Sequence, residues 1–350
     1  MQKQMKRRSD SVTIRDVAKQ AGVSVATVSR YINQNAPVSV ETAKRIQQVM
    51  LDVNYHPYAA ARHLVTRRTQ TIGLVLYSLQ TDFFLPLLSA IESAVSKNQY
   101  NLLVAGYKSP VGKDSQPPIG AHNTDGLLVF ADSLSEEHLA PLARAGFPLV
   151  LLYRTSPPNL KIPFVTVENR IATQKIIDHL IEEHGKRSII FVRGPHGQED
   201  SQAREQGYLD SLKKHGIAID KNLFVDGEFN GEVAYQNIKQ LVSHTHPHFD
   251  AIFTGDDDAA IGVLTALNEV GLRVPEDVAV VGFDDSRLST FLNPPLTTVH
   301  APTEEVGRTA MRLLFAQINE QPAESVTLQP EGIILRRSCG CPYEAPGRLH

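Results

Sequence analysis

Between Thr71 and Asp285 the sequence alternates short apolar runs with longer amphipathic segments, and this alternation restricts the fold more than any other feature. The apolar runs predict strands: IGLVLYS, NLLVAGY, DGLLVFA, PLVLLY, SIIFVRG, AIFTGDD and VAVVGFDD. The longer segments predict helices: LPLLSAIESAVSKNQ, RIATQKIIDHLIEEHG, SQAREQGYLDSLKKHG and DAAIGVLTALNEVG. Continuous apolar strands joined by amphipathic helices are typical of parallel sheets covered on both faces. There are too many units for one sheet, so we predict two similar lobes that meet near Val167.

The predicted lobes place a ligand site in the cleft between them, because ligands of parallel sheets bind beyond the carboxyl ends of the strands. Carboxylates stand at three such ends, and an arginine opens a following helix. Carboxylates accept paired hydrogen bonds from adjacent hydroxyls, and a guanidinium donates a planar fork. Phenylalanine rings can stack on a sugar or a base. The predicted ligand-binding residues are Phe83, Phe84, Arg154, Glu168, Arg204, Phe229, Asp256, Asp257 and Asp284. The alternative is that the acidic residues only cap helices or form turns.

The stretch TIRDVAKQAGVSVATVSRYIN, from Thr13 to Asn33, predicts two short helices joined by a glycine turn. Thr13 and Ser24 suit helix N-caps, and Gly22 suits a left-handed turn. A third helix is expected after Ser39. In the second helix Val28 and Ile32 point inward, so its remaining side chains are short and outward. This pattern predicts a helix-turn-helix unit whose second helix enters the DNA major groove. The alternative is a three-helix bundle that binds no DNA.

The next stretch, NYHPYAAARHLVTRRTQTIG, contains a short alanine-rich helical segment from Tyr58 to Leu64. Such a segment is too short to be a stable helix in water. It is either a plain linker or a hinge that folds only on DNA. In the second case Leu64 acts as an apolar wedge in a minor-groove step.

Charge separates the beginning of the chain from the rest. Residues 1–68 contain 12 Lys and Arg against 4 Asp and Glu, whereas the remainder contains 23 basic and 34 acidic residues. A basic head on an acidic body is expected of a module that binds a polyanion. No apolar run is long enough to cross a membrane, and no export signal follows the basic N-terminus. We therefore expect a cytoplasmic protein without a membrane partner.

Several chemical signals are weak. His244, His246 and His248 alternate in a predicted loop before a strand, so a metal site there is not favoured. Cys339 and Cys341, the only cysteines in 350 residues, have the wrong spacing for a zinc knuckle and no second pair nearby in the sequence. No glycine-rich nucleotide fingerprint and no nucleophile triad is visible. We expect no metal, no cofactor and no catalytic residue.

The motifs together resemble the lactose-repressor (LacI/GalR) family of bacterial transcription regulators. The similarity is carried by Thr13–Asn33, by NYHPYAAARHL, by GLRVPEDVAVVGFDDSRLSTFLNPPLTTVHAP and by RRSC, and so covers nearly the whole chain. It implies a periplasmic-binding-protein-like core, a dimer on a near-palindromic operator, Val25 and Ala26 as base-discriminating residues, and Leu64 as the intercalating residue. It strengthens the ligand assignment for Arg204, Asp257 and Asp284. The implied DNA-binding residues are Thr13, Ser24, Val25, Ala26, Thr27, Ser29, Arg30, Asn33, Tyr58, Ala61 and Leu64.

The sequence departs from the family pattern at four places. Tyr58 replaces a small polar capping residue, Asp256 an asparagine, and Glu168 an aspartate. The last two changes make the expected pocket more acidic, which favours a neutral polyhydroxylated ligand. The segment KSPVGKDSQPPIGAHNTDG contains too many prolines and glycines for the usual helix near the dimer contact.

The predicted domains are a DNA-binding head at 1–56, a hinge at 57–69, a core at 70–340 and a tail at 341–350. Within the core we predict one lobe from 70–167 and 294–327, and another from 168–293 and 328–340. The predicted function is that of a DNA-binding repressor controlled by a sugar. The alternatives are a regulator with a purine or nucleoside effector, a sugar-binding protein without a regulatory role, and a sugar-processing enzyme. The sequence does not decide whether the ligand releases DNA or promotes its binding.

Overall fold

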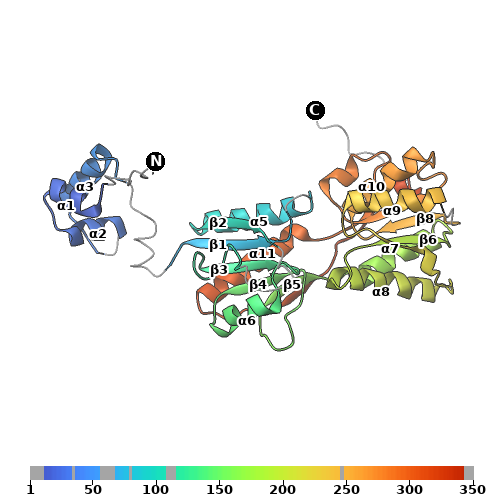
Figure 1. Cartoon of the computed structure of the whole chain (residues 1–350), viewed down its shortest axis with the longest axis horizontal. Helices are drawn as coiled ribbons and strands as arrows, with labels where there is room; N and C mark the ends of the chain where they lie inside the picture. The colour runs from blue at the N-terminus through green and yellow to red at the C-terminus, as the bar shows by residue number, and fades with distance from the viewer. Residues whose placement is uncertain are drawn as a thin grey trace, which may run out of the picture. The chain divides into compact units, whose positions relative to one another are not determined.

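The computed structural model describes residues 12–33, 36–55, 68–78, 81–107, 116–244 and 248–342. Contacts divide the chain into two compact units, residues 1–69 and 70–350 (Figure 1). Each unit has its own apolar core. Tyr58, Ala61, Leu64, His246 and the segment 343–350 lie outside the described residues. Among the described residues no helix is long and apolar enough to span a membrane.

The described part of the first unit contains three short helices around a small apolar core: α1 (Ile14–Ala21), α2 (Val25–Asn33) and α3 (Val40–Asp52). Asp16 fixes the start of α1, because its carboxylate accepts hydrogen bonds from the Thr13 backbone and hydroxyl at 2.8 and 2.7 Å. Gly22 ends α1 at φ +64°, a conformation that costs other residues free energy. The core consists of Val17, Ala18, Ala21, Val28 and Ile46. This arrangement is the predicted helix-turn-helix.

The second unit has two six-stranded sheets, one in each lobe. The sheet of the N-lobe has the order β11-β5-β4-β3-β1-β2 and is parallel throughout. Its elements are β1 (Thr71–Leu76), α5 (Phe84–Lys97), β2 (Asn101–Gly106), β3 (Gly126–Phe130), α6 (Glu136–Arg144), β4 (Leu149–Leu152), β5 (Phe164–Val167), α11 (Thr303–Ile318) and β11 (Val326–Leu328). Helices α5 and α11 contribute to the apolar core on one face, and α6 to the core on the other.

The sheet of the C-lobe has the order β12-β10-β9-β8-β6-β7, in which only β12 runs antiparallel to its neighbour. Helices α7 and α8 contribute to one core and α9 and α10 to the other. The elements are α7 (Arg170–Glu182), β6 (Ile189–Arg193), α8 (Glu199–Lys214), η1 (Lys221–Leu223), β7 (Phe224–Asp226), α9 (Gly231–His244), β8 (Ala251–Thr254), α10 (Asp257–Glu269), β9 (Ala279–Asp284), η2 (Arg287–Thr290), β10 (Thr297–His300), β12 (Gly332–Ile334) and η3 (Arg337–Cys339).

One predicted lobe boundary is wrong. The N-lobe was expected to resume at residue 294, but β10 pairs in parallel with β9 from Thr297 to His300 and belongs to the C-lobe sheet. Thr297 and Thr298 are also fully buried there. The chain therefore returns to the N-lobe only after His300. The other two changes of sheet follow β5, which ends at Val167, and β11, which ends at Leu328.

The proline-rich segment before β3 is described from residue 116 onward. From Gln116 to Asp125 it forms turns and contains no helix. Ile119 and Thr124 are buried, and Ile119 belongs to the core on the α6 side of the sheet. The segment thus contributes to the cover of this face by loop packing.

Candidate functional sites in the head and between the lobes

The second helix of the head presents short side chains to its exterior. Ser24 caps α2, since its Oγ accepts a hydrogen bond from the Thr27 backbone at 3.1 Å. Val28 is buried, whereas Val25 is 41% exposed although it is apolar. Ala26 and Arg30 are exposed as well. A capped helix with small outward residues and one arginine can approach base edges in a major groove without a steric obstacle.

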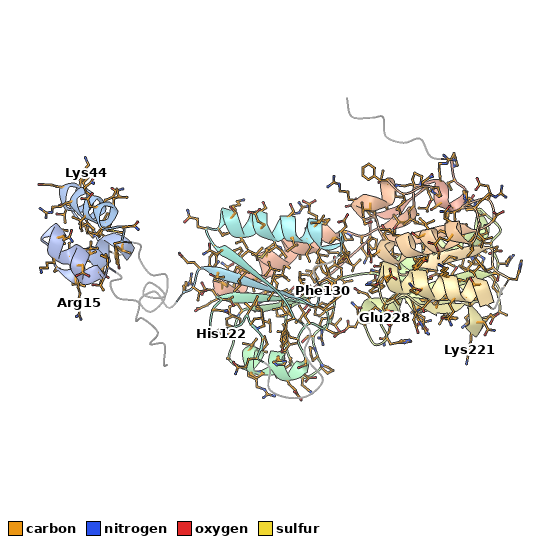
Figure 2. All side chains as sticks on the ribbon, turned by 45° about the horizontal axis from the view of Figure 1, so that its top comes forward. Arg15, Lys44, His122, Phe130, Lys221 and Glu228 are labelled. Carbon is orange, nitrogen blue, oxygen red and sulfur yellow. The ribbon has the colours of Figure 1, made fainter. Side chains whose placement is uncertain are left out.

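The other DNA-contact residues predicted in the described part of the head are Thr13, Thr27, Ser29 and Asn33. Thr27 and Ser29 are half-buried on α2. Thr13 is exposed, but its hydroxyl is already hydrogen-bonded to Asp16 at 2.7 Å. Asn33 is the last residue of α2. Figure 2 shows Arg15 and Lys44 projecting from the outside of the same unit, so further cations lie on its surface.

In the C-lobe a buried cluster forms around Arg204 of α8. The Arg204 guanidinium donates from Nε to Asn169 Oδ1 at 2.8 Å, from Nη1 to the Gly255 carbonyl, and from Nη2 to Asp284 Oδ1 at 3.4 Å. It also packs over the rings of Phe283 and Phe229, with its central carbon 3.7 and 5.2 Å from their centroids. Arg204 is thereby fixed in place, while its longest hydrogen bond, to Asp284, is the one most easily exchanged for a ligand.

The remaining predicted acids already have partners within the protein. Asp257 accepts hydrogen bonds from the Ser286 backbone at 2.7 Å and the Thr298 hydroxyl at 2.6 Å. Asp256 caps α10 through the Ala259 backbone at 3.0 Å. Glu168 accepts from the backbone at the start of α7. Each acid therefore has a structural role, whether or not it also contacts a ligand.

Burial makes these carboxyls poor acids. It raises the pKa of Asp200, Asp256 and Asp257 to about 7, and that of Asp284 well above its usual value. Arg204 opposes the effect at Asp284 without reversing it. One buried arginine among four buried carboxyls leaves no excess positive charge, so the cluster is unsuited to an anionic ligand. It is suited to a neutral ligand that both donates and accepts hydrogen bonds.

The N-lobe contributes aromatic rings. The Phe83 ring lies 5.3 Å from Tyr153 and 6.0 Å from Phe130, and Phe130 lies 5.5 Å from Tyr77, between ring centroids. Figure 2 shows Phe130 at the end of the N-lobe sheet nearer the C-lobe. Desolvation, and after it Asp256 and Asp284 of the C-lobe, raise the pKa of Tyr77. The aromatic group and the acidic cluster thus lie within electrostatic reach of each other.

Two predicted residues of the N-lobe are held mainly by that lobe. Phe84 is 2% exposed and belongs to the apolar core. Arg154 donates to the carbonyls of Ala131 and Leu134 at 3.2 and 3.3 Å and pairs with Asp132 at 3.2 Å. Both residues support the strand ends beside the aromatic group.

Residues with a positive φ gather at the carboxyl ends of strands. Ala131 follows β3 at φ +40°, Tyr153 follows β4 at +56°, and Phe229 follows β7 at +50°. Asp284, the last residue of β9, has φ +110°. Such conformations are unfavourable for residues with side chains and concentrate at functional sites. Their position agrees with the edge of the sheets where the ligand site was expected.

A cavity of about 370 Å³ opens at the junction of the lobes. Phe83 and Asp284, both predicted ligand contacts, line it together with His300 and Arg308. The lobes are also joined by hydrogen bonds from the backbone and hydroxyl of Thr155 to the Glu199 carboxylate, at 2.8 and 2.9 Å.

Five residues of this region were missed by sequence reasoning: Tyr77, Phe130, Tyr153, Asn169 and Asp200. Tyr77, Phe130 and Tyr153 end or follow apolar strand runs, and Asn169 follows Glu168 directly. The strand-end rule would have found these four had it been applied to aromatic and amide side chains as well as to acids. Asp200, which accepts from Asn169 at 2.8 Å, lies near the start of a helix and has no comparable signal.

Comparison with known proteins agrees with these features. Residues 13–58 match the model of bacterial regulatory proteins of the lacI family, and residues 177–339 match a periplasmic binding protein-like domain. Catabolite control protein A of Priestia megaterium is 31% identical over 94% of this chain and 99% of its own length. The HTH-type transcriptional repressor PurR of Pasteurella multocida (strain Pm70) is 31% identical over 93% of this chain and 98% of its own.

A solved structure, that of the transcriptional regulator CelR in complex with cellobiose, has a TM-score of 0.65 and 30% identity, covering 94% of this chain and 100% of that one. The relatives regulate transcription, which excludes the sugar-processing enzyme and the sugar-binding protein without a regulatory role. The chain therefore belongs to the LacI family and is a DNA-binding transcriptional regulator, not an enzyme.

Proposed function

We propose that this protein is a repressor that binds a near-palindromic DNA operator as a homodimer and responds to a neutral sugar held between its lobes. The observation that supports this most is the pairing of Arg204, on helix α8, with Asp284, at the strained end of β9, together with an aromatic group from the other lobe. Acids and a guanidinium match the hydroxyls of a sugar, and aromatic rings match its apolar face.

Within the predicted ligand set we assign different roles. Arg204 and Asp284 contact the effector through hydrogen bonds, and Phe83 and Phe229 contact it through their rings. Asp257 positions the loop after β9, since both of its oxygens already accept protein hydrogen bonds. Phe84 and Arg154 hold the N-lobe wall, and Asp256 and Glu168 shape the acidic side of the cleft while capping helices.

In the head we assign base contacts to Val25, Ala26 and Arg30, and phosphate contacts to Thr13, Ser24, Thr27, Ser29 and Asn33. In the hinge, Tyr58, Ala61 and Leu64 complete the contact in the minor groove, with Leu64 as the wedge. Effector binding acts as a population shift between two lobe arrangements, one of which spaces the two hinges of a dimer for DNA. Because basic side chains neutralise phosphates, operator affinity falls steeply with salt.

A purine effector is the second candidate, because the same rings can stack on a base and because PurR is among the relatives. A thermal-shift panel of the full-length protein separates the two. The panel contains neutral mono- and disaccharides, polyols, nucleosides and free purines. A ligand at 100 times its Kd adds about 2.7 kcal/mol to the free energy of unfolding, which moves the midpoint by several degrees.

We expect a sugar to raise the midpoint in the wild type and to lose most of this effect in Arg204→Lys, which keeps the charge but not the fork. Arg170→Lys is the matched control, because Arg170 is an exposed α7 residue paired with Asp210. Stabilisation by a purine alone would replace the sugar proposal, and an equal sugar shift in Arg204→Lys would remove Arg204 from the site.

A further inference from the structure

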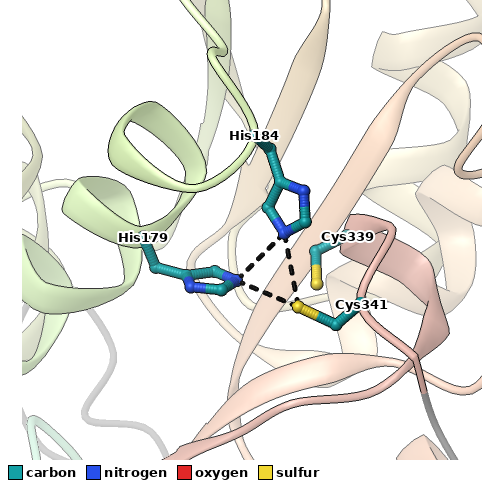
Figure 3. A group of neighbouring side chains, drawn as sticks. All are labelled: His179, His184, Cys339 and Cys341. Atoms are coloured by element: carbon teal, nitrogen blue, oxygen red, sulfur yellow. Dashed lines mark hydrogen bonds between the residues drawn. The ribbon is translucent and has the colours of Figure 1, made fainter.

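Two histidines and two cysteines that are distant in the sequence converge in the C-lobe (Figure 3). His179 lies in the last turn of α7, and His184 follows the end of that helix. Cys339 ends η3, and Cys341 comes two residues later. The Sγ atoms and one ring nitrogen of each histidine all lie within 4.8 Å of one another. Both cysteines are free thiols.

The distances among three of these atoms, Nε2 of His179, Nε2 of His184 and Sγ of Cys341, match a tetrahedral metal site. With zinc–sulfur bonds of about 2.3 Å and zinc–nitrogen bonds of about 2.0–2.1 Å, tetrahedral angles separate two nitrogens by roughly 3.3 Å, and a nitrogen from a sulfur by roughly 3.6 Å. The two histidine Nε2 atoms are 3.2 Å apart. Cys341 Sγ lies 3.3 Å from Nε2 of His184 and 3.5 Å from Nε2 of His179. These three side chains therefore need little movement to reach bonding positions, and Cys339 Sγ lies within 4.8 Å of each of the three atoms.

The backbone around the cysteines is fixed before any metal arrives. The Ser338 hydroxyl donates to the Val280 carbonyl at 2.6 Å and accepts from the Thr297 backbone at 2.8 Å, which ties η3 to β9 and β10. Cys339 is 2% exposed. Gly340 has φ +104°, and a Cβ at this position would lie 3.5 Å from the His184 ring. The contact would be an ordinary one, so glycine is favoured here by the left-handed turn between the cysteines and not by lack of space.

The histidine side is equally well ordered. After α7 the backbone of Gly185 donates to the Ile181 carbonyl at 3.1 Å, and that of Lys186 donates to the Leu180 carbonyl at 3.0 Å. These bonds close the helix and set the direction of His184. The two rings meet edge to face, with centroids 4.9 Å apart, so both Nε2 atoms point toward Cys341 (Figure 3).

We propose that His179, His184, Cys339 and Cys341 bind one zinc ion in a closed, four-coordinate structural site. Two sulfurs and two imidazoles form a donor set that prefers zinc to the hard cations magnesium and calcium. The ion connects the C-terminal segment to the end of α7 and so stabilises the C-lobe. None of the four ligands is assigned to DNA or effector binding, so the site is independent of the proposed regulatory function.

Metal analysis of the full-length protein tests this proposal. The protein is expressed with zinc in the medium, without a histidine tag, and is purified with a reductant. We expect one zinc per chain by mass spectrometry of the metal. Replacement of zinc by cobalt(II) should give a thiolate-to-cobalt charge-transfer band and the visible d–d bands of a tetrahedral complex.

Variants identify the ligands. Cys341→Ser and His184→Asn, at half-buried positions, should each lose the zinc and lower the midpoint of thermal unfolding. Cys341→Ser should also remove the part of the thiolate-to-cobalt band that Cys341 contributes. His215→Asn is the matched control. His215 also lies beside α7, in a group with Asp178 and Glu182 that could hold a cation, and this variant should retain the zinc.

The cobalt spectrum of the wild type decides the matter even if a variant fails to fold. The proposal is overturned if the wild type binds neither zinc nor cobalt tetrahedrally, or if the Cys341→Ser/His184→Asn double variant retains its zinc. It is also overturned if Cys339 and Cys341 form a disulfide while the reductant is present.

Discussion

At the scale of single residues, the cleft contains buried carboxyls whose protonation state is set by the fold. Asp256 shows this most clearly. It is 7% exposed and caps α10 through one oxygen, which an asparagine could do equally well. Unlike an asparagine, however, the Asp256 carboxyl can gain and lose a proton. Its energetic consequence is open to measurement.

We expect Asp256→Asn to reduce the dependence of stability on pH. Desolvation raises the pKa of Asp256 from 3.8 to about 7, so the folded state binds a proton that the unfolded state has released. Stability from this proton is present below pH 4 and is lost as the pH rises through about 7. As the pH rises from 4 to 7, the variant should therefore become more stable than the wild type. The difference in the free energy of unfolding is at most about 4 kcal/mol, at 1.4 kcal/mol per pKa unit.

The gain should be smaller than this limit, because Asp200 and Asp257 titrate in the same range and are coupled to Asp256. Urea unfolding from pH 4.5 to pH 8 measures it. Asp210→Asn is the control of opposite sign, since the hydrogen bond from exposed Arg170 lowers the pKa of Asp210. That variant should lose stability above pH 4. If the stability of Asp256→Asn and of the wild type varied equally with pH, Asp256 would be charged over the whole range from pH 4.5 to pH 8.

At the scale of elements, the turn between α1 and α2 determines how the second helix is presented. Gly22 has φ +64°, and no heavy atom lies within 4 Å of the position that a Cβ would occupy, so an alanine there meets backbone strain and no clash. We expect Gly22→Ala to destabilise the head by about 1 kcal/mol. It should speed hydrogen exchange of α1 and α2 amides in the full-length protein and weaken binding to DNA.

Gly146→Ala provides the matched control, because Gly146 has φ +67°, is equally unobstructed and follows α6 in the core. The control should speed exchange near α6 without changing DNA affinity. If both variants bind DNA like the wild type, the turn at Gly22 does not set the presentation of α2.

The elements themselves were largely predictable, whereas the contacts between distant elements were not. Periodicity predicted the strands and helices because each buries its apolar face locally. The boundary at residue 294 failed because β10 is short and its membership of a sheet depends on its pairing with β9. Likewise, Cys339 and Cys341 lacked a partner pair in the sequence. Their partners are His179 and His184, which the fold brings to the C-terminal segment. His184 and Cys341 are 157 positions apart in the sequence.

The candidate cleft was predicted in part for the same reason. The rule that ligands bind at the carboxyl ends of strands predicted Arg204 and Asp284 as ligand contacts, and the structure brings their side chains within 3.4 Å of each other. It did not reveal that Asp257 is occupied by Ser286 and Thr298, since those bonds depend on the packing of β9 and β10. Nor did it show the ring contacts that place Phe83 beside Tyr153.

At the scale of the whole molecule, regulation requires that ligand binding in the cleft and DNA binding by the head are energetically coupled. A ligand shifts the equilibrium between two lobe arrangements only by its difference in affinity for them. Thr155 and Glu199 join the lobes at one edge, and Phe83 and Asp284 line the cavity at their junction. A sugar that contacts both Phe83 and Asp284 touches both lobes and can favour one arrangement.

Control of DNA binding through this cleft is best tested by fluorescence anisotropy, with and without the sugar found by the thermal-shift panel, on DNA selected from a random pool by the wild-type protein. We expect saturating sugar to change the Kd for this DNA at least tenfold, about 1.4 kcal/mol. We also expect Arg204→Lys to bind the same DNA but to respond only at much higher sugar concentrations. An unchanged Kd at saturating sugar, or an equal response in Arg204→Lys, would contradict control of DNA binding through this cleft.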